Sequence, residues 1–129
     1  AILCAAVADF APESIADQKI KRTGDDMTIR LVPNPDIAAA LGKMKKDSQT
    51  LVGFALETHD EAVHAQEKLA RKNFDFIVLN SLNDEGAGFQ TDTNKISIIS
   101  TEGKEDFPLK PKAEVAKDIV DRLTQLVMR

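Results

Sequence analysis

The sequence predicts an α/β fold: a Rossmann-like three-layer sandwich around a mainly parallel central sheet. Short apolar segments alternate along the chain with segments of helical periodicity, which is the order that successive βαβ units produce. The apolar segments are hydrophobic throughout rather than at every second position, as in parallel strands that helices cover on both faces. The 129 residues suit a single domain with one buried core.

Five segments carry strand signals. Apolar residues dominate four of them, which cover residues 1–8, 51–56, 75–79 and 95–100. Residues 27–32 alternate in character instead, and Pro33 follows them directly. The first segment reads as a buried strand from its first residue. Because chain termini usually lie at the surface, we expect an amino-terminal part before Ala1 to be missing.

Three helices are predicted, two between these strands and one after the last of them. Asn34 and Pro35 have the form of an N-cap followed by proline at the first helical position, and they predict a helix over residues 35–46. Residues 58–61 have the form of a capping box, which predicts a second helix to about Lys72. The last helix begins at Pro111. Its apolar stripe consists of Val115, Ile119, Leu123 and Leu126.

Composition excludes several classes of protein and site. The net charge of −4 argues against a general nucleic-acid-binding surface, and no apolar run is long enough to span a membrane. Cys4 is the only cysteine, so no internal disulfide forms, and two histidines with one cysteine argue against structural zinc. We therefore expect a reducing, cytoplasmic setting. The two common glycine-rich phosphate loops are absent from the sequence.

A candidate site for a phosphorylated ligand lies early in the chain. Asp9 ends the first apolar segment, and a loop with the cations Lys19, Lys21 and Arg22 follows. In open α/β sheets, ligands bind beyond the carboxyl ends of the strands. Taken alone, the residue types favour a buried strand, an ordinary turn and a solvated basic loop, because structural turns outnumber functional sites on common folds.

Other residues are predicted to lie at or near the same edge of the sheet. Glu57 with Thr58, and Asn80, follow the carboxyl ends of predicted strands. Phe54 is either a flat apolar surface for a nucleobase or an ordinary core residue. The helix start at residues 34–37 offers free backbone N–H groups to an anion.

Lys68 and Lys72 are four residues apart and share one face of the second predicted helix. Cations in a last helical turn complement the helix dipole and usually face solvent. In a right-handed βα unit, that end of the helix lies opposite the carboxyl ends of the strands. Taken alone, these lysines are not a phosphate site.

The ordered motifs resemble the phosphopantothenate–cysteine ligase (phosphopantothenoylcysteine synthetase) domain of the bacterial bifunctional coenzyme A biosynthesis protein. The residues that carry the resemblance are AAVADF, Lys19-Ile20-Lys21-Arg22, Asn34-Pro35-Asp36-Ile37, Val52-Gly53-Phe54-Ala55, Lys72-Asn73 with Asp75, and Gly88-Phe89 with Asp92 and Asn94. Each motif is short, but their joint order and spacing are specific. Residues 1–129 are then the carboxy-terminal portion of a single nucleotide-binding ligase domain.

The resemblance implies a two-step ligation that uses CTP, with Mg²⁺ neutralising the triphosphate. The carboxylate of 4′-phosphopantothenate forms an acyl-cytidylate and releases pyrophosphate, and the cysteine amine then displaces CMP. Lys19 is implied as the catalytic residue, in a mobile loop that closes over the triphosphate. The implied nucleotide-binding residues are Leu3, Cys4, Ala5, Asp9, Lys19, Pro35, Asp36, Ile37, Ala38, Phe54, Lys68 and Lys72.

The sequence also departs from the family pattern. A Gly-rich turn and an Asn-containing segment that act on the acyl intermediate are absent, so we expect this chain alone to be inactive. The flavin-dependent decarboxylase usually fused upstream is absent too, so no FMN is expected. A homodimer is the inherited expectation. Alternatives are a non-catalytic nucleotide-binding module, a fragment of an NAD(P)-dependent oxidoreductase on fold analogy alone, and ATP in place of CTP.

Overall fold

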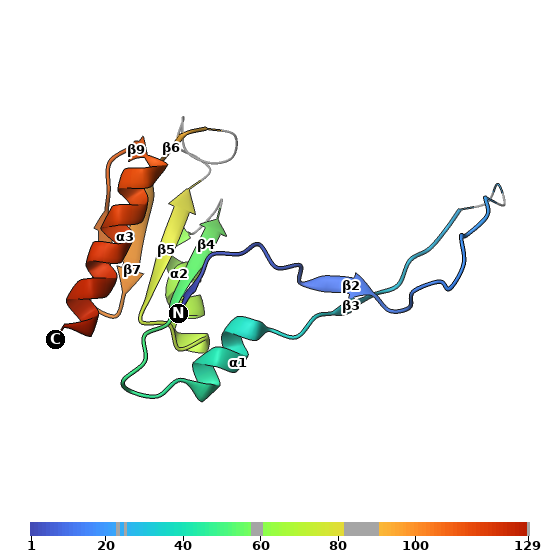
Figure 1. Ribbon diagram of the computed structural model, residues 1–129, viewed down its shortest axis with the longest axis horizontal. Coiled ribbons are helices and arrows are strands. Elements are labelled where there is room, and N and C mark those ends of the chain that lie inside the picture. Colours follow the sequence, from blue (N-terminus) through green and yellow to red (C-terminus); the bar gives the residue numbers. More distant parts are fainter. Residues whose placement is uncertain (23, 25, 58–60, 82–90, 129) are drawn as a thin grey trace. The chain divides into compact units, whose positions relative to one another are not determined.

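The structure, a computed structural model, describes residues 1–22, 24, 26–57, 61–81 and 91–128 (Figure 1). It divides into two compact units. The first unit comprises Ala1–Cys4 and Ala38–Arg129 and contains the central sheet. The second unit comprises Ala5–Ile37 and contains a two-stranded hairpin. Within the described residues, no helix is long and apolar enough to cross a membrane.

The first unit is built on a five-stranded sheet with the strand order β1-β4-β5-β7-β8. The strands are β1 (Ile2–Leu3), β4 (Val52–Glu57), β5 (Phe76–Ser81), β7 (Ile96–Ser100) and β8 (Gly103–Asp106). Strands β1, β4 and β5 run parallel, whereas β7 and β8 continue the sheet as an antiparallel hairpin. The predicted α/β class is confirmed, and the three parallel strands define one carboxyl edge.

Helices cover both faces of this sheet. Helices α1 (Ile37–Met44) and α2 (Glu61–Arg71) contribute to the core on one face, and α3 (Lys112–Val127) packs on the other. Two short strands, β6 (Thr93–Asn94) and β9 (Lys110–Pro111), pair with each other, and β9 directly precedes α3. The second helix and the last one were predicted closely, and the predicted stripe of α3 faces the sheet.

Strand β5 shows why the apolar segments are hydrophobic throughout. Phe76 and Val78 belong to the core under α3, whereas Ile77 and Leu79 belong to the core under α2. All four side chains are at most 2% exposed. Alternate residues of a strand point to opposite faces, so a sheet covered on both sides requires apolar residues at every position.

The first eight residues do not form the predicted buried strand. Only Ile2 and Leu3 pair with β4, and Ile2 is 38% exposed at the sheet edge. Residues 5–8 belong to the second unit and are exposed. Three of those four residues are alanines, whose small side chains bury little apolar area and have low strand propensity.

The second unit contains the antiparallel pair β2 (Phe10–Pro12) and β3 (Leu31–Pro33). The alternating segment at residues 27–32 therefore contributes to a hairpin rather than to the sheet. The Glu13 N–H donates to the Arg30 carbonyl at 2.9 Å, and the two side chains form an ion pair at 3.2 Å. These contacts close the hairpin stem on the side of its long loop.

Candidate functional site

The hairpin brings Asp9 beside the segment that precedes α1. The Asn34 backbone N–H donates to the Asp9 carbonyl at 2.8 Å, and Asn34 Nδ2 donates to the Ala8 carbonyl, also at 2.8 Å. Asn34 is therefore not the predicted N-cap, and α1 begins at Ile37, two residues later than expected. Because Pro35 and Asp36 directly follow Asn34, this pairing makes two predicted parts of the site neighbours.

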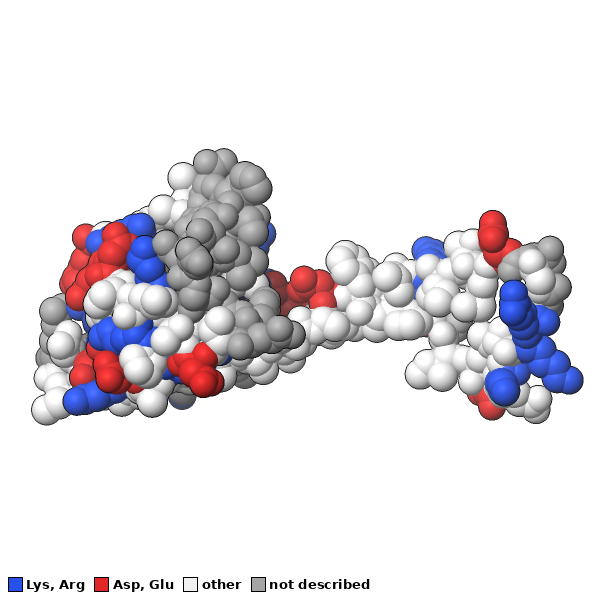
Figure 2. All heavy atoms as spheres, turned by 90° about the horizontal axis from the view of Figure 1, so that it is seen from above, with Lys and Arg blue, Asp and Glu red and all other residues white. Residues whose placement is uncertain are grey.

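Lys19 lies elsewhere in the second unit. It occupies the exposed loop between Glu13 and Arg30, beyond the contacts that close the stem. Lys21 and Arg22 are exposed in the same loop, and Figure 2 shows Lys and Arg side chains gathered there. Within this unit, the hairpin stem separates the basic loop from Asp9.

The remaining early residues divide between the units. Leu3 is register partner to Gly53 of β4, and both Leu3 and Ala38 pack against the core under α1 and α2. Cys4 follows as an exposed free thiol. Ala5 and Ile37 are exposed in the second unit.

Phe54 and Asn80 share one face of the sheet near its carboxyl edge. Phe54 is the register partner of Val78, and Asn80 follows Val78 by two residues on β5, so the two side chains project from the same face. Phe54 is only partly buried against the core under α3, and Asn80 is half-buried. A partly exposed ring beside an amide can contact a flat heterocycle.

A second amide holds Asn80. Asn94 Nδ2 donates to Asn80 Oδ1 at 2.9 Å, and Asn94 Oδ1 accepts the Lys95 backbone N–H at 2.9 Å. The two asparagines come from β6 and β5, and Asn80 is the register partner of Ile96 at the start of β7. The position of Asn80 at this edge was predicted from the sequence, but no sequence pattern indicated its hydrogen bond to Asn94. The Glu57 side chain and Thr58 lie outside the described residues.

Lys68 and Lys72 lie at the opposite, amino edge of the parallel strands. Lys68 is in the last turn of α2, and the Lys72 N–H donates to the Lys68 carbonyl at 3.0 Å. Three residues later, the Asp75 N–H donates to the Leu51 carbonyl just before β4. This placement agrees with the geometric objection raised from the sequence.

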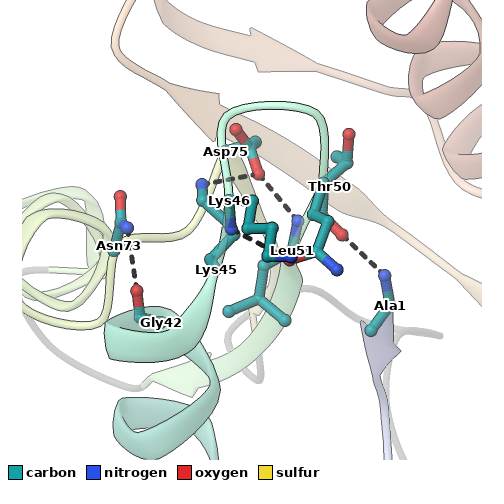
Figure 3. A network of polar contacts seen from close by, with 9 residues as sticks. Ala1, Gly42, Lys45, Lys46, Thr50, Leu51, Asn73 and Asp75 are labelled. Atoms are coloured by element: carbon teal, nitrogen blue, oxygen red, sulfur yellow. Dashed lines mark hydrogen bonds and ion pairs between the residues drawn. The ribbon is translucent and has the colours of Figure 1, made fainter.

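Polar contacts stabilise that amino edge (Figure 3). Asp75 Oδ2 accepts the Leu51 N–H at 2.7 Å and lies 3.0 Å from Lys45 Nζ. The Ala1 ammonium donates to the Thr50 carbonyl, and Asn73 Nδ2 donates to the Gly42 carbonyl at 2.9 Å. These contacts tie α1, α2 and three strands together at that edge.

The described residues contain no group of three or more His, Cys, Asp or Glu side chains that could hold a metal ion. Mg²⁺ that arrives with a nucleotide needs only one or two protein carboxylates, because phosphate oxygens and water supply the other ligands. Asp9 is exposed beside the Asn34 segment and fits that smaller requirement.

Known proteins with similar sequences share nearly the whole chain. A protein of an unknown prokaryotic organism, named cysteine/cysteine sulfinic acid decarboxylase, is 59% identical over 128 residues, which are 98% of this chain and 36% of that protein. The coenzyme A biosynthesis bifunctional protein CoaBC of Vibrio vulnificus is 41% identical over 128 residues, 98% of this chain and 32% of that protein. The chain thus spans about a third of the length of these relatives.

Solved structures agree with the sequence relatives. The C-terminal domain of a CoaBC protein superposes with a TM-score of 0.73 at 32% identity, covering 96% of this chain and 52% of that one. A Cab2 mutant in complex with phosphopantothenate-cysteine shares the fold, with a TM-score of 0.72 at 22% identity over 97% of this chain and 44% of that one. Residues 1–127 match the DNA/pantothenate metabolism flavoprotein C-terminal domain, and the chain belongs to that family.

Proposed function

We propose that the protein, at its native length, joins 4′-phosphopantothenate to cysteine at the expense of CTP, a step of coenzyme A biosynthesis. The observation that carries this proposal is the 41% identity over 128 residues to a protein named for coenzyme A biosynthesis. The Cab2 complex supports it through the fold, since the bound molecule there is the product of such a ligation.

The first step makes the acyl group reactive. A carboxylate oxygen of phosphopantothenate attacks the α-phosphorus of CTP, the bond to the β-phosphate oxygen breaks, and pyrophosphate leaves. Negative charge grows on the bridging and non-bridging oxygens, and positioned cations lower its energy. We assign this role to Lys19, with Lys21 and Arg22 as supporting charge and Asp9 as a ligand for the Mg²⁺ of the nucleotide.

The second step forms the amide. The neutral amine of cysteine attacks the acyl carbon of the mixed anhydride, the bond to the CMP oxygen breaks, and the amine loses a proton. Orienting the two reactants can supply a large part of the rate enhancement. Phe54, which is partly buried against the core under α3, is proposed to contact the base. The remaining nucleotide contacts proposed from the resemblance are Leu3, Cys4, Ala5, Pro35, Asp36, Ile37 and Ala38.

Lys68 and Lys72 enter the proposal on the resemblance alone, because the structure places them at the amino edge. The test is calorimetry of CTP binding with Lys68→Ala and Lys72→Ala, with Arg71→Ala on the same helix as the matched control. We expect the lysine variants, but not the arginine variant, to bind CTP more weakly. Equal affinities in all three would remove the lysines from the site.

The proposed function is tested by measuring pyrophosphate release with CTP, phosphopantothenate and cysteine together. Release should need all three substrates, and ATP should replace CTP poorly. CTP binding without any pyrophosphate release would instead favour a non-catalytic nucleotide-binding module.

A second candidate is decarboxylation of cysteine or cysteine sulfinic acid by the whole protein. The 59% identity to the relative of that name favours it. Release of CO₂ from labelled cysteine, without CTP or phosphopantothenate, would support this activity. Pyrophosphate release in the same preparation distinguishes a protein that has both activities from one that has either alone.

We also propose a homodimer, and a decarboxylase domain as a fused or separate partner. Within the described residues of the second unit, the large apolar side chains that stay exposed are Val7, Phe10, Ile15, Ile20, Met27, Ile29, Leu31 and Ile37. A two-stranded hairpin has little stability of its own, so a second copy covering these side chains would stabilise it. Light scattering should give twice the chain mass, and Phe10→Glu should lower the measured mass.

A cytoplasmic location of the protein stays a prediction.

A further inference from the structure

The carboxyl edge contains two asparagines whose orientation follows from a single backbone group. The Lys95 N–H can only donate, so the Asn94 atom 2.9 Å from it must be the acceptor Oδ1. Asn94 therefore turns its NH₂ group to Asn80, where Oδ1 accepts at 2.9 Å. As a result, the oxygen of Asn80 is engaged, and its NH₂ group keeps two donors that no described residue accepts.

We propose that Asn94 is a positioning residue that makes Asn80 a hydrogen-bond donor toward the nucleotide. The inference rests on the proposed function, because it takes the ligand at this edge to be CTP. Asn80 lies on the same face as Phe54, and among the described residues Asn94 is the hydrogen-bond partner of the Asn80 side chain. A base lying against the Phe54 ring would bring its carbonyl or ring-nitrogen acceptors close to Asn80 Nδ2.

This arrangement matters because a free asparagine amide can turn over and present either an acceptor or donors. A fixed amide has already lost that freedom, so binding costs less conformational entropy. It also selects against a ligand that presents a donor at the same point, since two donors would then face each other unpaired. Asn94 thus acts on the ligand through Asn80 without touching it.

The central test is Asn94→Asp in the protein at its native length. A carboxylate still accepts the Lys95 N–H but cannot donate to Asn80 Oδ1, so the Asn80 amide should turn and point its oxygen toward the ligand. We expect the Kd for CTP to rise about tenfold, the size of one lost hydrogen bond facing an unpaired acceptor. The KM values for phosphopantothenate and cysteine should stay within about twofold.

Three further variants separate positioning from other effects. Asn80→Ala removes the donor and should raise the Kd for CTP about as much as Asn94→Asp does. Asn94→Ala frees the Asn80 amide without reversing it and should raise the Kd for CTP about threefold. Gln49→Glu is the matched control: it makes the same amide-to-carboxylate change at the amino edge and keeps the bond accepted from the Lys46 N–H. It should leave the Kd for CTP unchanged.

Salt separates a reversed amide from charge repulsion. Repulsion between a new carboxylate and the triphosphate is screened when salt rises from 0.05 to about 0.5 M, whereas a lost hydrogen bond is not. The ratio of the Kd values of Asn94→Asp and the unchanged protein should therefore persist at high salt. A ratio near one at any salt overturns the inference, as does an equal loss for all three substrates.

The outcomes also separate this inference from the proposed function. If the unchanged protein binds no CTP, the proposed function is wrong. If it binds CTP and Asn94→Asp binds equally well, only the role of Asn94 is wrong. Should Asn94→Asp fail to fold, Asn94→Ala and Asn80→Ala decide. The inference requires both variants to bind CTP more weakly than the wild type, and Asn80→Ala to bind it more weakly than Asn94→Ala.

Discussion

Asp75 and Lys45 form an ion pair, with Oδ2 and Nζ 3.0 Å apart, and the same carboxylate oxygen accepts the Leu51 N–H at 2.7 Å. Asp75→Ala leaves that N–H and a mostly buried ammonium without this partner. We expect a loss of about 2 kcal/mol in the free energy of unfolding, measured with urea. Lys45→Met, which keeps the bond to Leu51, should cost less than about 1 kcal/mol. Equal losses would mean that the ion pair dominates.

Gly42 in α1 packs directly against the backbone at the end of α2. A Cβ at this position would lie 2.0 Å from the Lys72 carbonyl oxygen and 2.8 Å from its carbon. Glycine to alanine inside a helix usually stabilises a protein by about 1 kcal/mol. Here we expect the opposite sign, a loss of about 3 kcal/mol, because α1 must move away from backbone atoms that cannot rotate aside.

The control for Gly42→Ala is Gly103→Ala. Gly103 has φ 135°, and a Cβ there meets nothing within 4 Å, so only backbone strain opposes alanine. The loss should be about 1 kcal/mol. Thermal unfolding of both variants measures the difference. A more stable Gly42→Ala protein would contradict the close approach of α1 and α2.

Asp106 should make the stability of the β7–β8 hairpin depend weakly on pH in the acidic range. A hydrogen bond from Ser97 and the nearby Lys104 ammonium hold the pKa of Asp106 below its ordinary value of 3.8. A lowered pKa stabilises the folded state above the unfolded pKa, and that stability is lost as pH falls through the folded value. The side chain is 64% exposed, so the effect on global stability should be small.

The measurement for Asp106 is carboxyl NMR titration of that residue. Ser97→Ala should raise the pKa toward 3.8, because the hydrogen bond from Ser97 is the largest cause of the shift. Lys104→Gln should raise it less. A titration unchanged by Ser97→Ala would show that the charge of Lys104, not the hydrogen bond, sets the value.

Elements with strong apolar periodicity were predictable from sequence, and those fixed by pairing were not. β5 and α3 were predicted because burial on both faces, or along one stripe, dictates the positions of their apolar residues. β8 consists of Gly103, Lys104, Glu105 and Asp106, all exposed, so it has no such pattern. It is held by its pairing with β7. Likewise, nothing in residues 10–12 indicates a strand until β3 is placed beside it.

The position of Asn80 was predictable from the sequence, but its contacts were not. Asn80 was placed at the carboxyl edge because it follows an apolar strand, and this is where it lies. Its bond to Asn94 depends on how the chain returns through β6, which sequence spacing does not determine. The bonds from Asn34 to Ala8 and Asp9 depend in the same way on the pairing of β2 with β3.

Lys19 is the residue whose substitution should most clearly separate catalysis from folding. Its exposure in the hairpin loop predicts that Lys19→Ala changes the free energy of unfolding by less than about 0.5 kcal/mol. Ligation should nevertheless fall by about 100-fold or more in kcat, because a cation that stabilises charge in the transition state is lost. Lys43→Ala, an exposed lysine in the last turn of α1, is the matched control and should keep full activity. Pyrophosphate release measures the activity of both variants. Normal turnover by Lys19→Ala would show that Lys19 is an ordinary solvated loop residue without a catalytic role.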